Sequence, residues 1–489
     1  MKLRELYSCL KDHKPSDFTE KEVCGITCDS RKVKDGYVFV AIRGYKADGH
    51  DYVMSAIEKG ATALVVDKKT TTASSIPQIV VSDTRYALAA MSTCFYGNPS
   101  SRMTVVGVTG TNGKTTTSYF TKSIIETSGS KTGLIGTIQY QIGKKVMPAQ
   151  ETTPESVEIQ RYLAEMLESG IKYAVIEASS HALSQHRLEG VHFRSAIFTN
   201  LSVEHLDYHA TIQNYRTEKL KLVKGLDTKA VAILNADHNA SKHFAECTRA
   251  QVIWYGIKKK DADVTAETIQ IDVDKTRFLL NSSWGKIDIS MNLVGIHNVY
   301  NALAAAANGL ALGFKIETIK AGIESLSGVP GRLEKIDCGQ DFHVYVDFAH
   351  THQALQVVLS TLRETTKGRI ILVFGCGGDR DRKKRPKMGH IAEKYSDIFW
   401  ITSDNPRSED PDNIIDEIQK GVRRKTCFRV QADRSIAIEE AILEAKKGDV
   451  VVIAGKGHEQ YQTSKDITIP FDDREIVRQI LKTSTIPHF

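Results

Sequence analysis

Hydrophobic and polar positions alternate along the chain in two recurring patterns. Short runs rich in β-branched and aromatic residues, such as TVVGV at 104–108 and DIFWI at 397–401, have the length and composition of buried strands. Segments with the apolar spacing of a helix follow most of these runs. This alternation predicts an α/β fold with parallel sheets covered by helices. Alternating polar and apolar residues between 262 and 292 predict a small β appendage.

Two Gly/Pro breaks divide this pattern. YGNPSSR, at 96–102, separates a helical segment from the strand TVVGV, and GVPGR, at 328–332, follows the helical segment ETIKAGIESL. A length of 489 residues predicts roughly three domains, at about 150 residues per domain. We therefore expect domains at 1–100, 101–330 and 331–489, with the appendage on the middle one.

Composition describes a globular protein and excludes several classes. Apolar residues make up 41% of the chain and charged residues 25%, and the net charge of +6 is spread among acids and bases rather than gathered in a stripe for nucleic acid. The N-terminus is too charged for a signal peptide, and no apolar run approaches the roughly 20 residues that cross a bilayer. We expect a cytoplasmic protein without membrane insertion.

Cysteine usage adds no metal site to this interpretation. Eight cysteines are scattered along the chain, and only Cys24 and Cys28 lie close together. No second pair completes a zinc site of the usual spacing. The expectation is buried thiols in a reducing compartment.

The segment GTNGKTTT, which follows TVVGV, predicts a phosphate-binding loop. Gly110 and Gly113 let the backbone curl so that its N–H groups point at phosphate oxygens, reinforced by a helix that begins near Lys114. Lys114 can neutralise the β- and γ-phosphates, and the Thr115 hydroxyl can bind Mg²⁺. Val108 stands where the usual motif has its first glycine, so a chance Gly-rich turn is the alternative.

GTNGKTTT also resembles the ATP loop of the Mur ligases and of their relatives, the folylpolyglutamate synthetases. Those enzymes activate a carboxylate as an acyl phosphate and join it to an amine. The resemblance covers nearly the whole chain and implies a UDP-sugar-binding N-terminal domain, a central ATP-binding domain with a P-loop and a parallel sheet, and a Rossmann-like C-terminal domain that binds an amino acid. The ATP contacts that it implies are Gly110, Thr111, Asn112, Gly113, Lys114, Thr115, Thr116, Asn298, Arg332 and Asp347.

Two strand ends carry candidate metal ligands. Glu177 ends the apolar run YAVIE, and His205 follows the run that ends in IFTN. Each is by itself as often a cap or turn residue as a ligand. The resemblance implies that both bind Mg²⁺ together with Thr115, at the strand edge where phosphates are expected.

Lys219 is a catalytic candidate through a modification that the resemblance implies. The family carbamylates the matching lysine, giving N6-carboxylysine from CO₂. A carbamate offers two anionic oxygens to Mg²⁺, whereas an ammonium would repel the cation. The alternative is a solvated helix face, since Lys221 and Lys224 lie nearby. The implied catalytic group is Lys114, Glu177, His205 and Lys219.

Segments in the first two domains resemble those that bind a UDP-linked muramoyl dipeptide. TCDSRKV and IRGYKADGHDY lie in the first hundred residues, and ETTPES and ASSHALSQHR lie in the middle domain. Hydroxyls, an amide and a guanidinium suit a ligand with a diphosphate and carboxylates. A helix or turn cap is the alternative for the DSR segment. The implied contacts are Ser30, Gly44, Tyr45, Lys46, Thr152, Thr153, Ser179, Gln185 and Arg187.

Three loops that follow strands in the last domain predict an amino-acid site. Consecutive βα loops meet at the carboxyl edge of one sheet, where open α/β domains bind ligands. Arg407 can be an ordinary turn residue, but its guanidinium suits a distal carboxylate and Glu459 suits a distal ammonium. meso-Diaminopimelate carries both groups, whereas lysine lacks the carboxylate. The resemblance implies contacts from Arg380, Asp404, Asn405, Pro406, Arg407, Gly455 and Glu459.

The expected activity is an ATP-dependent ligation that releases ADP and phosphate. It would join meso-diaminopimelate to UDP-N-acetylmuramoyl-L-alanyl-D-glutamate in peptidoglycan precursor synthesis, in a monomer that binds only small molecules. A lysine-adding ligase conflicts with Arg407, and a folylpolyglutamate synthetase would not need the first hundred residues. A nucleotide-gated binding protein without ligase activity conflicts with the retention of the four catalytic candidates.

Overall fold

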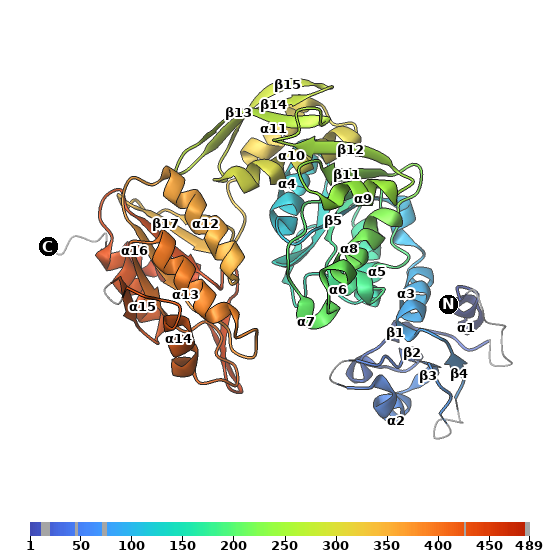
Figure 1. Cartoon of the computed structure of the whole chain (residues 1–489). Coiled ribbons are helices and arrows are strands. Elements are labelled where there is room, and N and C mark those ends of the chain that lie inside the picture. The colour runs from blue at the N-terminus through green and yellow to red at the C-terminus, as the bar shows by residue number, and fades with distance from the viewer. Residues whose placement is uncertain (11–19, 45–46, 71–75, 425–426, 485–489) are drawn as a thin grey trace. The chain divides into compact units, whose positions relative to one another are not determined.

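The structure, a computed structural model, describes the chain except for residues 11–19, 45–46, 71–75, 425–426 and 485–489 (Figure 1). Strands and helices alternate along most of its length, which confirms the predicted α/β fold. The chain packs as two compact units. The first comprises Met1–Thr265, Asn281–Ile287 and Tyr300–Gly322, and the second comprises Ala266–Leu280, Asp288–Val299 and Ile323–Phe489. The three predicted domain ranges stay a prediction.

A four-stranded parallel sheet begins the first unit (Figure 1). Its strands follow one another in space as in sequence: β1 (Gly25–Thr27), β2 (Tyr37–Val40), β3 (Ala61–Val66) and β4 (Gln78–Val80). Val38 and Val40 pack in the apolar cluster on one face, and Phe39 packs in the cluster on the other. Successive side chains of a strand point to opposite faces, so burial of both explains the continuous apolar run YVFV. The accompanying helices are α1 (Leu3–Tyr7), α2 (Val53–Glu58) and α3 (Thr84–Phe95), with short 3₁₀ turns η1 (Ser30–Lys32), η2 (Gly49–Tyr52) and η4 (Pro99–Arg102).

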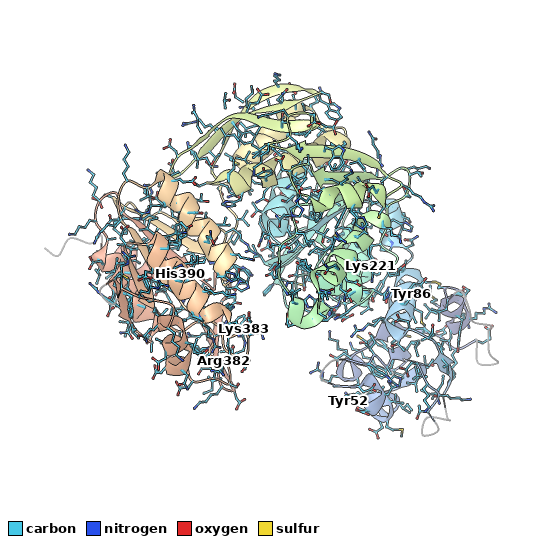
Figure 2. All side chains as sticks on the ribbon, viewed as in Figure 1. Tyr52, Tyr86, Lys221, Arg382, Lys383 and His390 are labelled. Carbon is cyan, nitrogen blue, oxygen red and sulfur yellow. A yellow bond between two sulfur atoms is a disulfide. The ribbon has the colours of Figure 1, made fainter. Side chains whose placement is uncertain are left out.

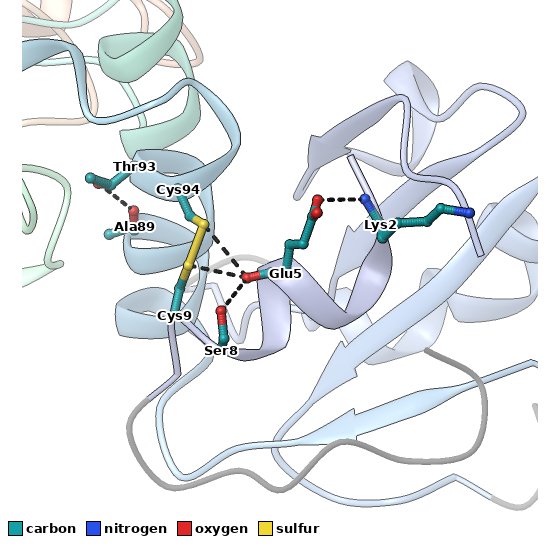
Figure 3. The surroundings of a disulfide bond; sticks show 7 residues. All are labelled: Lys2, Glu5, Ser8, Cys9, Ala89, Thr93 and Cys94. Atoms are coloured by element: carbon teal, nitrogen blue, oxygen red, sulfur yellow. Dashed lines mark hydrogen bonds between the residues drawn. A yellow bond between two sulfur atoms is a disulfide. The ribbon is translucent and has the colours of Figure 1, made fainter. Parts of the chain in front are cut away.

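A disulfide joins Cys9 to Cys94 in this part of the chain (Figure 3). The two residues are 85 positions apart in sequence, and the packing of α1 against α3 brings their Cα atoms to 6.5 Å. Both sulfurs lie close to the carbonyl oxygen of Glu5, at 3.4 and 3.6 Å. The expectation that all cysteines are buried thiols is therefore wrong. Of the six free cysteines only Cys376 is buried. Sequence spacing carries no information about such a long-range approach.

An eleven-stranded sheet carries the phosphate loop. Its order is β15-β14-β13-β12-β11-β10-β5-β9-β6-β7-β8, with parallel pairing from β13 through β6 and antiparallel pairing of β6, β7 and β8. The strands are β5 (Thr104–Thr109), β6 (Thr132–Ile135), β7 (Gln139–Ile142), β8 (Lys145–Pro148), β9 (Tyr173–Glu177), β10 (Ser195–Phe198), β11 (Val231–Asn235), β12 (Gln251–Gly256), β13 (Val264–Ile271), β14 (Thr276–Ser282) and β15 (Gly285–Met291). The expected β appendage therefore extends the edge of this sheet.

Helices lie between strands of this sheet in the sequence, as crossovers between parallel strands require. They are α4 (Lys114–Thr127), α5 (Ser156–Glu168), α6 (Ser180–Ser184), α7 (Leu206–His209), α8 (Ile212–Lys224) and α9 (Ala240–Glu246), and α10 (Ile296–Ala311) and α11 (Ile316–Ser325) follow its last strand, β15. Helix α4 begins at Lys114, as the loop motif predicts. No helix among the described residues is both long and apolar enough to cross a membrane.

The second unit contains a six-stranded sheet in the order β16-β17-β21-β18-β19-β20. Its strands are β16 (Glu334–Ile336), β17 (His343–Asp347), β18 (Ile370–Phe374), β19 (Ile398–Ile401), β20 (Phe428–Val430) and β21 (Val450–Ala454), all parallel except β16. The helices are α12 (His352–Thr365), α13 (Lys384–Tyr395), α14 (Pro411–Gln419), α15 (Arg434–Glu444) and α16 (Asp473–Ser484), and a hairpin follows β21 with strands β22 (Tyr461–Ser464) and β23 (Ile467–Pro470). Apolar clusters bury both faces of the sheet. The predicted loops after β18, β19 and β21 therefore come from three adjacent strands.

Candidate active site

The phosphate loop connects the central strand β5 to helix α4. Gly110 and Gly113 have φ angles of +149° and +84°, which glycine adopts without the steric cost of a side chain. A Cβ atom at Gly110 would collide with the Thr199 hydroxyl, and one at Gly113 would collide with the side chain of Asn301. Glycine is thus required at both positions by backbone conformation and by close packing.

The end of the neighbouring strand β10 holds this loop in shape. The N–H of Thr111 donates to the Asn200 carbonyl at 2.9 Å, and the N–H of Asn112 donates to the Asn200 side chain at 2.9 Å. The Thr199 hydroxyl donates to the carbonyl of Asn112 at 2.6 Å. Our sequence reasoning missed Thr199 and Asn200. The feature that could have identified them is their position directly after strand β10, which is parallel to β5 and adjacent to it.

Two lysine ammonium groups meet at one carbonyl of the loop. Lys114 Nζ donates to the carbonyl oxygens of Gly110 and Thr111 at 3.0 and 2.9 Å, and Lys219 Nζ donates to that of Gly110 at 2.7 Å. Lys219 is 1% exposed, whereas Lys221 on the same helix is exposed (Figure 2). Burial, and then the charge of Lys114, holds the pKa of Lys219 well below its usual value. The alternative of a solvated helix face is therefore wrong for Lys219.

Glu177 lies fully buried at the end of β9, the other neighbour of β5. Its carboxylate accepts hydrogen bonds from the hydroxyls of Thr115 and Thr137 at 2.9 and 2.8 Å. The backbone N–H of Thr137 adds a third at 3.0 Å. The structure thus places Glu177 beside Thr115, as the resemblance implies. Thr137 was missed, although it follows β6, the strand next to β9.

His205 is the N-cap residue of helix α7 and has a left-handed backbone conformation, with φ of +56°. Its side chain is 43% exposed, and partial desolvation, followed by the nearby charges of Lys114 and Lys219, lowers the pKa of His205 to about 4. Its imidazole is therefore neutral at neutral pH, the form that binds metals. Its ring centroid lies 5.9 Å from that of Tyr215.

Tyr215, on helix α8, links these groups and was missed by the sequence reasoning. Its hydroxyl lies 3.2 Å from the Thr111 hydroxyl, and Lys219 Nζ lies 4.6 Å from the centroid of its ring. Because Tyr215 is 1% exposed, it packs the loop, the lysine and the histidine against one buried ring. Its signal is the helical spacing of four residues from Lys219.

The donor set at this edge fits a hard divalent cation. Mg²⁺ prefers oxygen ligands, and a threonine hydroxyl, a carboxylate and a neutral imidazole are available from Thr115, Glu177 and His205. No group of three or more His, Cys, Asp or Glu side chains among the described residues is arranged to hold a metal ion. A cation here would therefore depend on further oxygens from a nucleotide or a modified lysine.

Five of the residues predicted to bind the UDP-linked substrate form a second cluster beside Glu177. The Thr153 hydroxyl donates to the Glu177 carbonyl at 2.6 Å and lies 3.2 Å from the Ser179 hydroxyl. The Thr152 hydroxyl lies 3.2 Å from that of Thr137. Pro154 stands two residues before Ser156, the first residue of α5.

Gln185 and Arg187 complete this cluster. Arg187 donates to the Gln185 side chain at 2.9 Å, to the Thr153 carbonyl at 2.8 Å, and to the carboxylate of Glu151. Burial, and then the charge of Arg85, lowers the pKa of Arg187 to about 10. Arg85, from helix α3, also donates to Gln185 at 3.3 Å. Arg85 was missed, because only tertiary packing brings it here.

The first hundred residues contribute less to this cluster. Ser30 begins η1, where its carbonyl accepts from Lys59 at 3.1 Å, and the exposed Gly44 donates its N–H to the Ala47 carbonyl at 2.9 Å. Within the described ranges no hydrogen bond joins either residue to the second cluster. Tyr45 and Lys46 lie outside the described residues.

The remaining nucleotide candidates belong to the second unit. The Arg332 guanidinium lies 4.9 Å from the ring centroid of Phe348. Asp347, at the end of β17, accepts from the N–H groups of Leu333 and Ala349 at 2.7 and 2.8 Å. Burial raises its pKa despite the opposing charge of Arg332. The Asn298 amide donates to the Val294 carbonyl at 2.8 Å at the start of α10.

The loops after β18 and β19 meet at Arg407. Its guanidinium donates to the Gly378 carbonyl at 2.8 Å, and its backbone has a φ of +54°. The preceding Pro406 and Asn405 are buried. Arg380 is exposed and donates to the adjacent Asp379 carbonyl at 3.0 Å. Arg407 therefore contacts the loop that carries Arg380 through the Gly378 carbonyl. Among the described residues, no hydrogen bond joins the side chains of Arg407 and Arg380.

The loop after β21 completes this arrangement. Gly455 has a φ of +119°, and a Cβ atom there would meet the carboxylate of Asp404 at 2.7 Å. The Asn405 amide donates to Glu459 Oε2 at 2.8 Å. Lys456, 0% exposed, donates to the same oxygen at 3.1 Å and was missed by the sequence reasoning. Its signal was a lysine between two glycines directly after an apolar strand.

The fold and its phosphate loop are those of an ATP-dependent ligase. Three protein-family models match the chain: the Mur ligase family catalytic domain at 22–96, the Mur ligase middle domain at 108–309, and the Mur ligase glutamate ligase domain at 331–457.

Relatives and solved structures agree with these matches. A UDP-N-acetylmuramoyl-L-alanyl-D-glutamate--2,6-diaminopimelate ligase from Syntrophomonas wolfei is 44% identical over 99% of this chain and 99% of its own. The protein of the same name from Bacillus licheniformis is 45% identical over 98% and 99%. A solved structure with that name has a TM-score of 0.72 at 30% identity, covering 99% of both chains. A MurF ligase from Thermotoga maritima in complex with ADP shares the fold, with a TM-score of 0.63 at 18% identity over 95% and 97%. The chain belongs to the Mur ligase family.

Proposed function

We propose that this protein is the ligase that adds meso-2,6-diaminopimelate to UDP-N-acetylmuramoyl-L-alanyl-D-glutamate during peptidoglycan precursor synthesis. The observation that carries the choice of amino acid is the meeting of three adjacent βα loops at Arg407 and Glu459. A guanidinium and a carboxylate on one rim complement the carboxylate and ammonium at the far end of meso-diaminopimelate. The names of the full-length relatives support the same reaction.

The first step is transfer of the γ-phosphoryl group of ATP to the D-glutamyl side-chain carboxylate. Lys114 leaves the loop carbonyls that it contacts and turns to the phosphates, where its charge offsets the charge of the transferring group. The loop from Gly110 to Thr116 offers N–H groups to the phosphates, with the N-terminus of α4 behind it. Asn298, Arg332 and Asp347 are proposed to contact the adenosine part of the nucleotide.

Thr115, Glu177, His205 and a carbamylated Lys219 are proposed to hold Mg²⁺. When bound, Mg²⁺ supplies positive charge to the phosphate oxygens. Burial lowers the pKa of Lys219, which favours the neutral amine whose lone pair attacks CO₂. A bond forms between Nζ and carbon, a nitrogen proton leaves to water, and a carbamate with two anionic oxygens results. The negative charge of the carbamate would attract the ammonium group of Lys114.

The UDP-linked dipeptide is proposed to lie along the second cluster. Arg187 and Gln185 suit its carboxylates, and the hydroxyls of Thr152, Thr153 and Ser179 suit its amide and carboxylate oxygens. Ser30 and the loop from Gly44 to Lys46 are proposed to contact the uridine diphosphate. Because the Glu151 carboxylate forms an ion pair with Arg187 in the structure, a substrate carboxylate that binds Arg187 is expected to displace it.

The second step forms the amide bond. The amine of meso-diaminopimelate attacks the acyl phosphate carbon, a tetrahedral intermediate forms, and the carbon–oxygen bond to phosphate breaks as the amine loses a proton. The loop residues Arg380, Asp404 to Arg407, Gly455 and Glu459 orient the amino acid for this attack. We further propose three domains at 1–100, 101–330 and 331–489, a monomer, and work in the cytoplasm, where ATP is supplied.

The proposal is tested by ADP release with MgATP and UDP-N-acetylmuramoyl-L-Ala-D-Glu, with meso-diaminopimelate or L-lysine in parallel. Wild type should prefer meso-diaminopimelate strongly. Arg407→Ala should raise its KM roughly tenfold to a hundredfold, the worth of a charged hydrogen-bonded contact. Arg423→Ala, which removes an exposed cation of the same unit, should leave it unchanged.

The outcomes separate the candidate functions. Equal use of lysine by wild type would make the choice of amino acid wrong and leave the ligase assignment standing. ADP release that needs neither the dipeptide nor an amino acid would overturn ligation itself. Near-normal turnover by Lys114→Ala would contradict the phosphate-loop assignment.

A further inference from the structure

We propose that Lys456 is a positioning residue of the amino-acid site, which orients Glu459 for the distal ammonium of the substrate and balances the charge of the site. The inference rests on the proposed function, because it assumes an amino acid with a second head group at this rim. It adds a residue that the sequence motifs do not mark as a ligand.

Lys456 is buried among acceptors instead of reaching solvent. Its side chain is 0% exposed, and Nζ lies 3.1 Å from Glu459 Oε2 and 3.2 Å from Asn405 Oδ1. The Asn405 amide donates to the same Glu459 oxygen at 2.8 Å. The three side chains therefore form a closed triangle of hydrogen bonds. A buried ammonium is stable only with such partners, since its desolvation is costly.

This triangle leaves one oxygen of Glu459 available. Both hydrogen bonds that fix the carboxylate use Oε2, and its side chain is 20% exposed. No side-chain hydrogen bond to Oε1 occurs within the part of the chain that the structure describes. Lys456 and Asn405 thus hold Glu459 from the buried side, and Oε1 is the atom that can accept a ligand ammonium.

The hairpin β22–β23 makes the support of this triangle rigid. The N–H of Thr463 donates to Asn405 Oδ1 at 3.0 Å, and the Gln462 amide donates to the Asp404 carbonyl at 2.7 Å. The N–H of Arg407 donates to the Thr463 carbonyl at 3.0 Å. Strand β22 therefore fixes the loop that carries Arg407 and fixes Asn405, against which Lys456 is held.

The charge of Lys456 has a consequence for substrate choice. Lys456 balances Glu459, so Arg407 remains to pair with a distal carboxylate. Without Lys456 the rim gains net negative charge, which repels the distal carboxylate of meso-diaminopimelate. Lysine lacks that carboxylate and would be affected less. Loss of Lys456 is therefore expected to weaken the preference for meso-diaminopimelate over lysine.

The test compares steady-state kinetics of full-length wild type, Lys456→Met, Glu459→Gln and the double variant. Lys456→Met should raise the KM for meso-diaminopimelate about tenfold or more, as loss of a charged hydrogen bond does, and leave the KM values for ATP and the UDP-linked dipeptide unchanged. The preference of Lys456→Met for meso-diaminopimelate over lysine should also fall. In the Glu459→Gln background the same substitution should have little further effect, because Lys456 acts through Glu459. Lys447→Met removes an exposed lysine of the same unit as a control.

Several results would overturn the inference. An unchanged KM for meso-diaminopimelate, a similar rise for all three substrates, or full additivity with Glu459→Gln would each do so. If Lys456→Met does not fold, Lys456→Gln keeps a hydrogen-bond donor without the charge, and its effect should again be confined to the amino acid. Wild type without activity toward meso-diaminopimelate would instead contradict the proposed function, so the two failures are distinguishable.

Discussion

At the scale of single residues, the carboxyl edge of the large sheet combines side chains that are costly to bury. The side-chain nitrogens of Lys219 and Lys114 both donate to the Gly110 carbonyl, and Glu177 lies fully buried close to the same loop. Buried charges need partners, and here the partners include loop carbonyls and threonine hydroxyls. The proposed reaction requires that a nucleotide and a cation replace some of these partners.

The first residue-scale prediction concerns Lys219. Lys219→Ala should lower kcat at least about a hundredfold, since even groups that only support metal ligands are worth tenfold to a hundredfold. Acetate or formate should restore part of the activity, because a small carboxylate can supply the missing oxygens. Lys221→Ala, two residues along α8, should behave as wild type. Activity of Lys219→Ala near that of wild type would exclude the carbamate.

The second residue-scale prediction concerns pH and His297, on helix α10. Burial lowers its pKa from 6.5 to about 4. The unfolded chain therefore binds a proton between these values while the folded chain does not, so the stabilisation is present above pH 6.5 and is lost as the pH falls toward 4. Between pH 7 and pH 5 the loss should be about 2 kcal/mol.

Denaturant unfolding of wild type and His297→Gln at the two pH values measures this contribution. The fall in the free energy of unfolding on acidification should be smaller in the variant by that amount. His192→Gln, at an exposed histidine, is the matched control and should keep the wild-type pH dependence. An equal fall in wild type and His297→Gln would show that folding does not lower the pKa of His297.

At the scale of elements, helices α15 and α16 are joined beneath the amino-acid loops. Arg434 and Asp473, both fully buried, form two hydrogen bonds of 2.8 Å. Arg434 also donates to the carbonyl oxygens of Ala454 and Ser403 at 3.0 and 3.4 Å. The first residues of two helices thereby support the strand ends from which two site loops begin.

Breaking this pair should be strongly destabilising. Arg434→Met leaves the Asp473 carboxylate buried without its partner, which should lower the free energy of unfolding by about 3–5 kcal/mol. The double variant Arg434→Met/Asp473→Asn should recover part of the loss. Arg429→Met, which removes the more exposed pair with Glu444, should cost at most about 1 kcal/mol. The measurement is denaturant unfolding. Equal losses in the free energy of unfolding for Arg434→Met and Arg429→Met would show that burial of the Arg434–Asp473 pair does not increase the cost of breaking it.

At the scale of the whole molecule, the catalytic candidates and the amino-acid loops lie in different compact units. Lys114, Glu177, His205 and Lys219 belong to the first unit. The groups proposed to bind meso-diaminopimelate belong to the second, which also holds the nucleotide candidates Asn298, Arg332 and Asp347. Substitutions that share no contacts usually have independent effects. Acyl phosphate formation should therefore survive changes in the amino-acid loops.

This separation can be measured as isotope exchange between ADP and ATP without an amino acid, in the presence of the UDP-linked dipeptide. Arg407→Ala should keep the wild-type exchange rate within a factor of about two. Lys114→Ala should lose exchange, because its charge is needed for phosphoryl transfer. Loss of exchange in Arg407→Ala would show that the amino-acid loop contributes to the first step.

The order of elements and the places of most site residues follow from the sequence alone. Strand, loop and helix around Lys114 were predicted because buried strands, glycines and helix starts have local signatures. Glu177 and Arg407 could be placed at sheet edges because Glu177 ends an apolar run and Arg407 lies in the loop that follows one. The carboxyl ends of parallel strands lie at the same edge of a sheet, so a residue that ends or follows such a strand is predicted to lie at that edge.

The tertiary structure alone decided which side chains support these residues. Thr137 and Lys456 come from loops after strands, and Tyr215 and Arg85 come from helices. Their local sequence can mark a position as a candidate, but it does not identify the partner. The burial of Lys219 beside exposed Lys221 and the approach of Cys9 to Cys94 likewise depend on how helices pack. Local patterns determine elements through propensity and periodicity, whereas partners far apart in the chain are chosen by the packing of completed elements, which no short window of sequence contains.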